Sequence, residues 1–428
     1  MPYHVDGTFA MHTLKDPVAP NSRGWLARQV LPTGVHAGAL PLLVGRALRG
    51  FCDGFIAVLL PAYLLALGFA QLAVGLISSA TLIGSALATI LVGILGHRYP
   101  QRRLLVLAAA LMVATGIGFA GLSSLWPLLP VAFVGTLNPS SGDVSVFLPL
   151  EQARLADSSS SDARTALFAR YSLTGAFSAA VGALAAALPG WLAPQLGISF
   201  LSAMRVMFMI YALTGVALWF LYARIPEPHP HATSVRVPLG PSRRIVTRLA
   251  LLFSVDAFAG GLVVNSLLAL WLMQRFGLSL GAAGQFFFSA GMLAAGSQLV
   301  AVPLSRKFGL LNTMVFTHIP SSLCLIAAAF SPSLVAALAL LLVRSALSQM
   351  DVPTRTAYVM AVVTPPERPA AASLTAVPRS LASALGPTLA GALFAMGWVG
   401  APLVACGLLK IAYDLALLGT FRRIRPVD

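Results

Sequence analysis

Long apolar runs alternate with short polar breaks along almost the whole chain. Each run has about 20 residues or more, the length that a helix needs to cross the hydrocarbon core of a membrane. The strands of a membrane barrel would instead be alternating segments of roughly ten residues. The pattern therefore predicts an all-α polytopic membrane protein. Its twelve expected transmembrane helices lie at 39–66, 71–95, 103–122, 126–150, 165–188, 203–223, 249–273, 281–304, 311–330, 333–352, 371–396 and 400–420.

Composition agrees with a lipid environment for these runs. Of the 428 residues, 58% are hydrophobic and 10% are charged, and a soluble protein of this length would need more charge to cover its surface. Cys52, Cys324 and Cys406 all fall inside apolar runs, so we expect small buried side chains and neither a disulfide framework nor a metal site. The first 38 residues lack the pattern of a signal peptide, so we expect no cleaved leader.

The positions of the basic residues explain the net charge of +15. A nucleic-acid-binding protein would gather them on one surface, whereas here most of the 28 lysines and arginines fall in alternate breaks between apolar runs. Loops on the cytoplasmic side of a membrane carry an excess of Lys and Arg. We therefore expect a multi-pass protein of the cytoplasmic membrane, with both termini in the cytoplasm, the lipid bilayer as its surroundings and no nucleic-acid partner.

The longest polar break contains five prolines and divides the chain into halves of six predicted helices each. We expect a cytoplasmic tail at 1–38, a six-helix bundle at 39–223, a cytoplasmic linker at 224–248, a second bundle at 249–421 and a short tail at 422–428.

Matching residues recur in the two halves at a nearly constant offset, which indicates an internal duplication. At an offset of 209 positions the matches are Gly68 with Gly277, Gly75 with Gly284, Arg98 with Lys307, Arg170 with Arg379 and Gly182 with Gly391, and at 208 Asp143-Val144 matches Asp351-Val352.

Twelve helices in two parallel repeats, with a central linker and cytoplasmic termini, resemble the major facilitator superfamily over nearly the whole chain after residue 38. Gly93-Ile-Leu-Gly-His97-Arg98-Tyr-Pro100-Gln-Arg102-Arg103 is similar to that family's signature between helices two and three. His97 stands where the family usually has Asp, and the second half has Arg306 in the acidic position. The resemblance implies alternating access of two pseudo-symmetric bundles around a site near the membrane midplane.

Charged residues within the predicted spans are candidates for function, because a charge at the bilayer centre costs about 2.5–3.5 kcal/mol on insertion scales. Arg49 and Asp53 are four residues apart on one face of a helix. They form either a structural ion pair or a site where the Asp53 carboxylate exchanges a proton. Both interpretations place the two residues near the substrate path.

The second half offers three further candidates for binding substrate or protons. Asp256 precedes Gly260, Gly261 and Asn265, and the glycines permit bending of the helix near the midplane, although Asp256 would snorkel if it lies near the membrane edge. Arg344 lies within a predicted span, where a guanidinium suits an anionic group of the substrate. The alternative is that Arg344 pairs with Asp256 or another acid.

An inner gate is expected near the cytoplasmic ends of the spans. We expect Asp143 to meet Arg98 and Arg379 across the interface between the halves. Asp351 would meet Lys307 and Arg170 in the same way, and pairing within each half is the alternative. Glu151 is expected to support this group from the inner loop.

Other residues are set aside. Lys410 and Asp414 are four apart and are expected to form a local pair without a role in transport. His318 precedes Pro320 and is interpreted as a packing residue near a kink, with proton coupling as the lesser interpretation. His229 and His231 lie in the proline-rich linker without further metal ligands, so no metal site is expected.

These features predict a secondary transporter that moves a small organic solute by alternating access, with no cofactor. Neither a phosphate-binding loop nor a clustered nucleophile or metal set is present, so an ATP-driven pump and an enzyme are not expected. Arg49 and Arg344 favour an organic anion, whereas the run Phe286-Phe287-Phe288 suits an amphipathic drug. We expect a monomer coupled to protons, with sodium as the alternative ion, and export rather than uptake. The alternatives are proton-coupled uptake of a metabolite and a transporter-like receptor or scaffold.

Overall fold

The apolar runs form helices, because a backbone in lipid can satisfy its N–H and C=O groups only within such an element. The structure is a computed structural model that describes residues 31, 35, 37–140, 145–158, 161–226, 240–364 and 367–422. The helices of the first half are η2 (Ala37–Ala39), α2 (Leu40–Ala66), α3 (Gln71–Leu95), η3 (Gly96–Arg98), α4 (Gln101–Gly121), α5 (Leu125–Val134), α6 (Phe147–Asp157), α7 (Ser161–Ala185), α8 (Leu188–Leu196) and α9 (Phe200–Ala223). Those of the second half are α10 (Arg243–Gly261), α11 (Asn265–Phe276), α12 (Leu280–Phe308), α13 (Leu310–Phe330), α14 (Leu334–Ser348), α15 (Asp351–Ala361), α16 (Arg368–Ala395) and α17 (Ala401–Phe421).

The all-α, polytopic fold class is confirmed. In the described part of the chain, nine helical segments are long and apolar enough to cross a membrane, and α5 and α14 are shorter apolar helices. All of these segments fall on predicted spans. The count of twelve spans remains a prediction.

Three of the predicted spans are interrupted, which the apolar pattern did not show. The span at 126–150 is divided into α5 and α6, that at 249–273 into α10 and α11, and that at 333–352 into α14 and α15. Pro139, which lies in the first break, cannot donate a backbone hydrogen bond to a helix. The breaks place Ser140, Asn265 and Gln349 beside the space between the halves.

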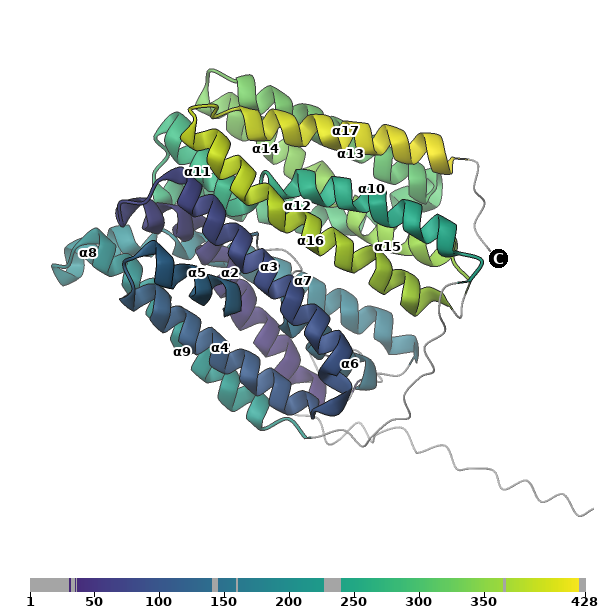
Figure 1. Cartoon of the computed structure of the whole chain (residues 1–428), viewed down its shortest axis with the longest axis horizontal. Coiled ribbons are helices and arrows are strands. Elements are labelled where there is room, and N and C mark those ends of the chain that lie inside the picture. The colour runs from purple at the N-terminus through teal and green to yellow at the C-terminus, as the bar shows by residue number, and fades with distance from the viewer. Residues whose placement is uncertain are drawn as a thin grey trace, which may run out of the picture.

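Equivalent helices pack together in the two halves (Figure 1). In the first half α2 packs against α7 and α4 against α9, and in the second half α10 packs against α16 and α13 against α17. Between the halves, α3 packs against α16 and α7 against α12. This repeated pattern supports our proposal that 39–223 and 249–421 are the two bundles.

The break between the halves is shorter than the sequence predicts, because α10 begins at Arg243 and not after residue 248. Its first turn carries exposed polar residues, which resemble a loop in the sequence. Residues 227–239 of the predicted linker lie outside the described residues. Just before α16, Glu367 accepts hydrogen bonds from the backbone of Gly240 and from Thr364. Hydrogen bonds from Ser242, Thr364 and Gly240 lower the pKa of Glu367 to about 2.

Small residues bring the halves into close contact at one end of the molecule. We call this end the far side, and we call the end at which α2 begins and α17 ends the terminal side. A Cβ added at Gly75 would lie 2.3 Å from the backbone oxygen of Pro387, and one added at Gly284 would lie 2.5 Å from that of Ala183. Gly75 and Gly284 are one of the repeated pairs in the sequence. The duplication therefore supplies two equivalent tight contacts between the halves.

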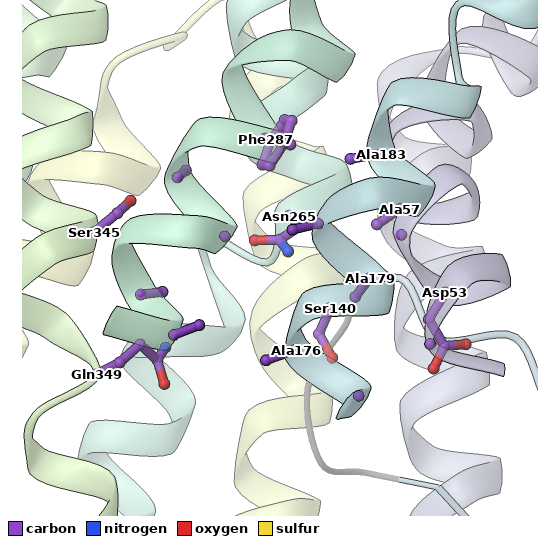
Figure 2. Close-up of a pocket in the computed structure, with 18 of the residues that line it drawn as sticks. Asp53, Ala57, Ser140, Ala176, Ala179, Ala183, Asn265, Phe287, Ser345 and Gln349 are labelled. Atoms are coloured by element: carbon purple, nitrogen blue, oxygen red, sulfur yellow. The ribbon is translucent and has the colours of Figure 1, made fainter. Parts of the chain in front are cut away.

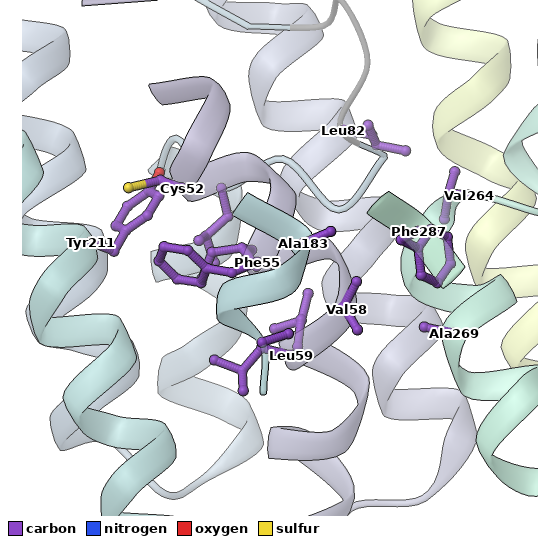
Figure 3. Close-up of a cluster of buried hydrophobic side chains, with 14 of the residues drawn as sticks. Cys52, Phe55, Val58, Leu59, Leu82, Ala183, Tyr211, Val264, Ala269 and Phe287 are labelled. Carbon is purple, nitrogen blue, oxygen red and sulfur yellow. The ribbon is translucent and has the colours of Figure 1, made fainter. Parts of the chain in front are cut away.

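A cluster of buried apolar side chains surrounds α2 (Figure 3). Phe55 and Leu59 of α2 are fully buried, with Tyr211 of α9 on one side and Phe287 of α12 on the other. Cys52 is buried in this cluster beside Tyr211 and packs as a small apolar residue. Because α2 is enclosed in this way, its charged residues must find partners inside the protein.

A candidate substrate cavity between the halves

A cavity of about 270 Å3 lies between the two halves. In the first half α2 and α7 line it, and in the second half α11, α12 and α14 do (Figure 2). Its first wall consists mainly of Gly and Ala. A Cβ at Gly54 would lie 2.0 Å from the backbone oxygen of Ala179, so α2 and α7 pack too closely for larger residues there. The small side chains leave the space between the halves open.

Three of the five residues predicted to bind substrate or protons line this cavity. Asp53 lies on the first wall, and Asn265 and Arg344 belong to the second. Figure 2 shows Asn265 between Asp53 on one side and Ser345 and Gln349 on the other. Asn265 is the first residue of α11, so the break after Gly261 brings its amide to the cavity, as the glycines suggested. Asn138 forms a hydrogen bond with Asp53.

Arg344 differs from the other buried basic residues of the second half, because no side chain in the described part of the chain forms an ion pair with it. It is half-buried, and the neighbouring titratable group that acts on it is the thiol of Cys406. The predicted alternative, a pair with Asp256, is wrong, because other cations occupy that carboxylate. The guanidinium of Arg344 therefore lines the cavity without a carboxylate partner.

Arg49 does not line the cavity, and its predicted pair with Asp53 is wrong. Its guanidinium forms an ion pair with Glu151 of α6 and lies 4.3 Å from the ring centre of Phe147. Glu151 is fully buried and also accepts hydrogen bonds from the hydroxyls of Tyr171 and Tyr222. The sequence placed Glu151 in an inner loop with the gate. The break between α5 and α6 instead turns it into the bundle.

Asp256 belongs to a buried network in the second half and not to the cavity wall. Its carboxylate receives hydrogen bonds from Arg355 of α15 at 2.9 Å and from Lys410 of α17 at 2.7 Å. Asp256 is 3% exposed, so the snorkelling alternative is wrong. Arg355 lies 5.3 Å from the ring centre of Phe253, as Arg49 lies over Phe147. The two halves thus use similar pairs with the acid and the arginine exchanged.

Lys410 and Asp414 extend this network, so their interpretation as a local pair is wrong. His318 of α13 lies between them, with its Nδ1 atom 3.0 Å from a carboxylate oxygen of Asp414 and its Nε2 atom 3.3 Å from Lys410. All three side chains turn away from the helix surface toward other helices, which an i,i+4 spacing does not reveal. The sequence gave one sign of this network, a histidine within an apolar run.

The predicted gate residues are not paired as expected in this conformation. Asp351 pairs with Arg355 on its own helix, not with Lys307 or Arg170. Lys307 is exposed and lies 5.4 Å from the ring centre of Phe308. Arg98, Arg170 and Arg379 are also exposed on the terminal side, and Asp143 lies outside the described residues. Hydrogen bonds that join the halves include Ser79 with Thr388 and Ser78 with Ser266.

The sequence profile described as Major Facilitator Superfamily matches residues 42–347 and 249–427, nearly the whole of the described chain. The chain belongs to the major facilitator superfamily. An uncharacterized membrane protein of Saccharomyces cerevisiae is 23% identical over 410 residues, which cover 87% of this chain and 92% of the relative. Membership in the superfamily makes this chain a multi-pass membrane transporter rather than an enzyme.

Solved structures of superfamily members share the fold. A D-xylose–proton symporter aligns with a TM-score of 0.69 at 15% identity and covers 91% of this chain and 97% of its own. A bacterial homologue of the human lysosomal transporter Spinster, in an inward-facing and unoccupied conformation, aligns with a TM-score of 0.68 at 16% identity and covers 91% of this chain and 98% of its own. These structures support the fold and leave the substrate to be argued from the cavity.

Proposed function

We propose that this chain is a proton-coupled secondary transporter that exports a small organic anion across the cytoplasmic membrane. The observation that carries the anionic substrate is Arg344, whose guanidinium lines the cavity without a carboxylate partner among the described residues. A buried cation without a partner is costly, and a bound anion removes this cost when it binds. A guanidinium also offers two parallel donors to a carboxylate or phosphate.

The rest of the cavity defines the kind of anion. Asn265, Ser345 and Gln349 supply hydrogen-bonding groups near Arg344, and Phe286 and Phe287 supply an aromatic wall. A volume of about 270 Å3 holds a compact molecule and excludes a large amphipathic drug. We therefore favour a small carboxylate or phosphate ester with an apolar or planar body.

Asp53 gives the cavity a carboxylate on the wall opposite Arg344. A proton on Asp53 would change the net charge of the cavity when an anion enters or leaves, so Asp53 stays our candidate for proton coupling within the cavity. Asp53→Asn is expected to abolish accumulation driven by a pH gradient and to leave exchange of bound substrate measurable. Full gradient-driven transport in this variant would remove Asp53 from the mechanism.

Alternating access is supported by the contacts between the halves. Gly75 and Gly284 allow close packing on the far side, while the basic gate residues of the terminal side are exposed. We interpret this conformation as closed on the far side, with the cavity facing the terminal side, which is the cytoplasm in the predicted topology. Transport then requires the far-side contacts to separate.

Thermal stability of the purified chain tests the anionic substrate. A ligand that binds the folded state raises the melting temperature. Benzoate, succinate and glycerol 3-phosphate are compared with the uncharged benzamide and glycerol and with choline. We expect at least one anion to stabilise the wild type and its uncharged analogue to have no effect. Arg344→Ala should abolish that stabilisation, and Arg344→Lys should weaken it.

Arg205→Ala is the matched control, because Arg205 lies outside the cavity and donates a hydrogen bond to Ser123 at 2.6 Å. It should respond to the anion as the wild type does. Stabilisation by choline or the uncharged compounds alone, or an unchanged response in Arg344→Ala, would overturn the proposal of an anionic substrate.

A further inference from the structure

A buried cluster beside the cavity has an unbalanced charge. Its carboxylates are Asp256, Asp351 and Asp414, and its permanent cations are Arg355 and Lys410. Each of the three carboxylates is at most 5% exposed. With a neutral imidazole at His318, three negative charges face two positive ones in the described part of the second half. An unbalanced buried charge is costly, so the cluster favours the binding of one proton.

The hydrogen-bond pattern around His318 identifies the state without that proton. An ammonium group only donates hydrogen bonds, so at 3.3 Å from Lys410 the Nε2 atom of His318 must accept. Its Nδ1–H then donates to the carboxylate of Asp414 at 3.0 Å. The imidazole is therefore the neutral tautomer, held on one side by an acid and on the other by a cation.

We propose that His318, together with Asp414, forms a proton-binding site of this transporter. A proton from the aqueous side binds to Nε2 of His318, and the Nδ1–H bond to Asp414 stabilises the imidazolium. The new Nε2–H can no longer accept from Lys410, and the Oδ1 atom of Asp256 is the nearby acceptor, 3.8 Å away. Lys410 donates to that same oxygen at 2.7 Å. Protonation of His318 therefore weakens the contact between Lys410 and Asp256.

This contact lies next to the elements that form the cavity. The Nζ atom of Lys410 would be 3.9 Å from a Cβ at Gly260, which precedes the break that carries Asn265. Ser321, one turn from His318 on α13, donates a hydrogen bond to the backbone oxygen of Arg344 at 3.4 Å. A proton at His318 can thus alter both Asn265 and Arg344 through direct neighbours. Its use in transport rests on the proposed function.

The surroundings of His318 contain few other titratable groups. From α17 it faces Lys410, Asp414 and the ring of Tyr413, whose centre is 6.2 Å from that of the imidazole. From α10 it faces Asp256, and α15 adds Asp351, Arg355 and Tyr358. Arg344 is the charged residue of α14, and α12 carries charges only at its exposed end, at Arg306 and Lys307. The acid and the base nearest to His318 are therefore Asp414 and Lys410.

Titration of His318 tests the site without any transported solute. The full chain, labelled with 15N-histidine and purified in detergent, is followed by NMR from about pH 5 to pH 9. The chain has seven histidines, and His318→Gln assigns the signal by its disappearance. We expect this signal to titrate. Asp414→Asn should move its midpoint to lower pH and Lys410→Met to higher pH, each by about tenfold in proton affinity, because each removes a charge in contact with the ring.

Cys324→Ser, on the same helix and half-buried, is the control and should leave the midpoint unchanged. A His318 signal that does not titrate, or a midpoint that moves in the same direction in both variants, would overturn the proposal. If one variant does not fold, the direction of the shift in the other decides. Failure here is distinguishable from failure of the proposed function, because anion binding is measured separately by the thermal-stability panel.

Discussion

Arg49 on α2 forms an ion pair with Glu151 on α6, and both side chains are almost completely buried, at 3% and 0% exposure. Removing one partner of a buried ion pair leaves an uncompensated charge, which costs about 3–5 kcal/mol. We expect Arg49→Met and Glu151→Gln each to lower the melting temperature strongly. The double variant should be less destabilised than the sum of the single variants, because it buries no unpaired charge.

Melting temperatures of the four proteins in one detergent give this comparison. Additive losses in the double variant would show that Arg49 and Glu151 do not depend on each other. The same experiment with Arg205→Met provides a control, because Arg205 is hydrogen-bonded to Ser123 near the surface.

Gly75→Leu should shift the transporter away from the conformation described here. A Cβ at Gly75 already lies 2.3 Å from the backbone of α16, so a leucine keeps the far side from closing. The terminal side should then close more often. Labelling of an Arg379→Cys variant by a membrane-impermeant maleimide should fall several-fold when Gly75→Leu is added.

Gly93→Leu is the matched control for this experiment. It lies on the same helix, and no atom lies within 4 Å of a Cβ added there. Equal labelling in the Gly75→Leu and Gly93→Leu backgrounds would show that the far-side contact does not control access to the terminal side.

The hydrogen bonds to Glu367 predict a dependence of stability on pH. The pKa of Glu367 in the folded protein is about 2, below its ordinary value of 4.5. A lowered pKa stabilises the fold at pH values above the unfolded value, and this stabilisation is lost as the pH falls through the folded value. Wild type should therefore melt above Glu367→Gln at pH 7, and the difference should shrink below about pH 4.5. A difference that is independent of pH would contradict this role of the carboxylate.

Much of the fold could be predicted from the sequence, because span length and polar breaks are local properties. The repeated glycines were also informative, since Gly75 and Gly284 make equivalent contacts across the halves. The breaks at Asn265 and near Pro139 were harder to locate, because the runs that contain them are apolar throughout. The site residues Asp53, Asn265 and Arg344 were found because a polar group within an apolar span is costly without a purpose.

Pairing could not be predicted, because it depends on how helices are rotated and packed. Arg49 and Asp53 share a helix face, as do Lys410 and Asp414, yet Arg49 contacts Glu151 and Lys410 contacts Asp256. Glu151, Arg355 and His318 are central to these networks and were not chosen as site residues. An acid directly after the span at 126–150, and an arginine four residues after Asp351, were the signals available.

Transport in proteoliposomes tests the central claim most directly. The anion that stabilises the wild-type chain among benzoate, succinate and glycerol 3-phosphate is loaded as a radiolabelled compound, and its exchange across the membrane is measured with wild type, Arg344→Ala and Arg205→Ala. We predict rapid exchange with wild type and Arg205→Ala and at least a tenfold slower rate with Arg344→Ala. Exchange at the wild-type rate in Arg344→Ala would contradict the claim that Arg344 binds the transported anion.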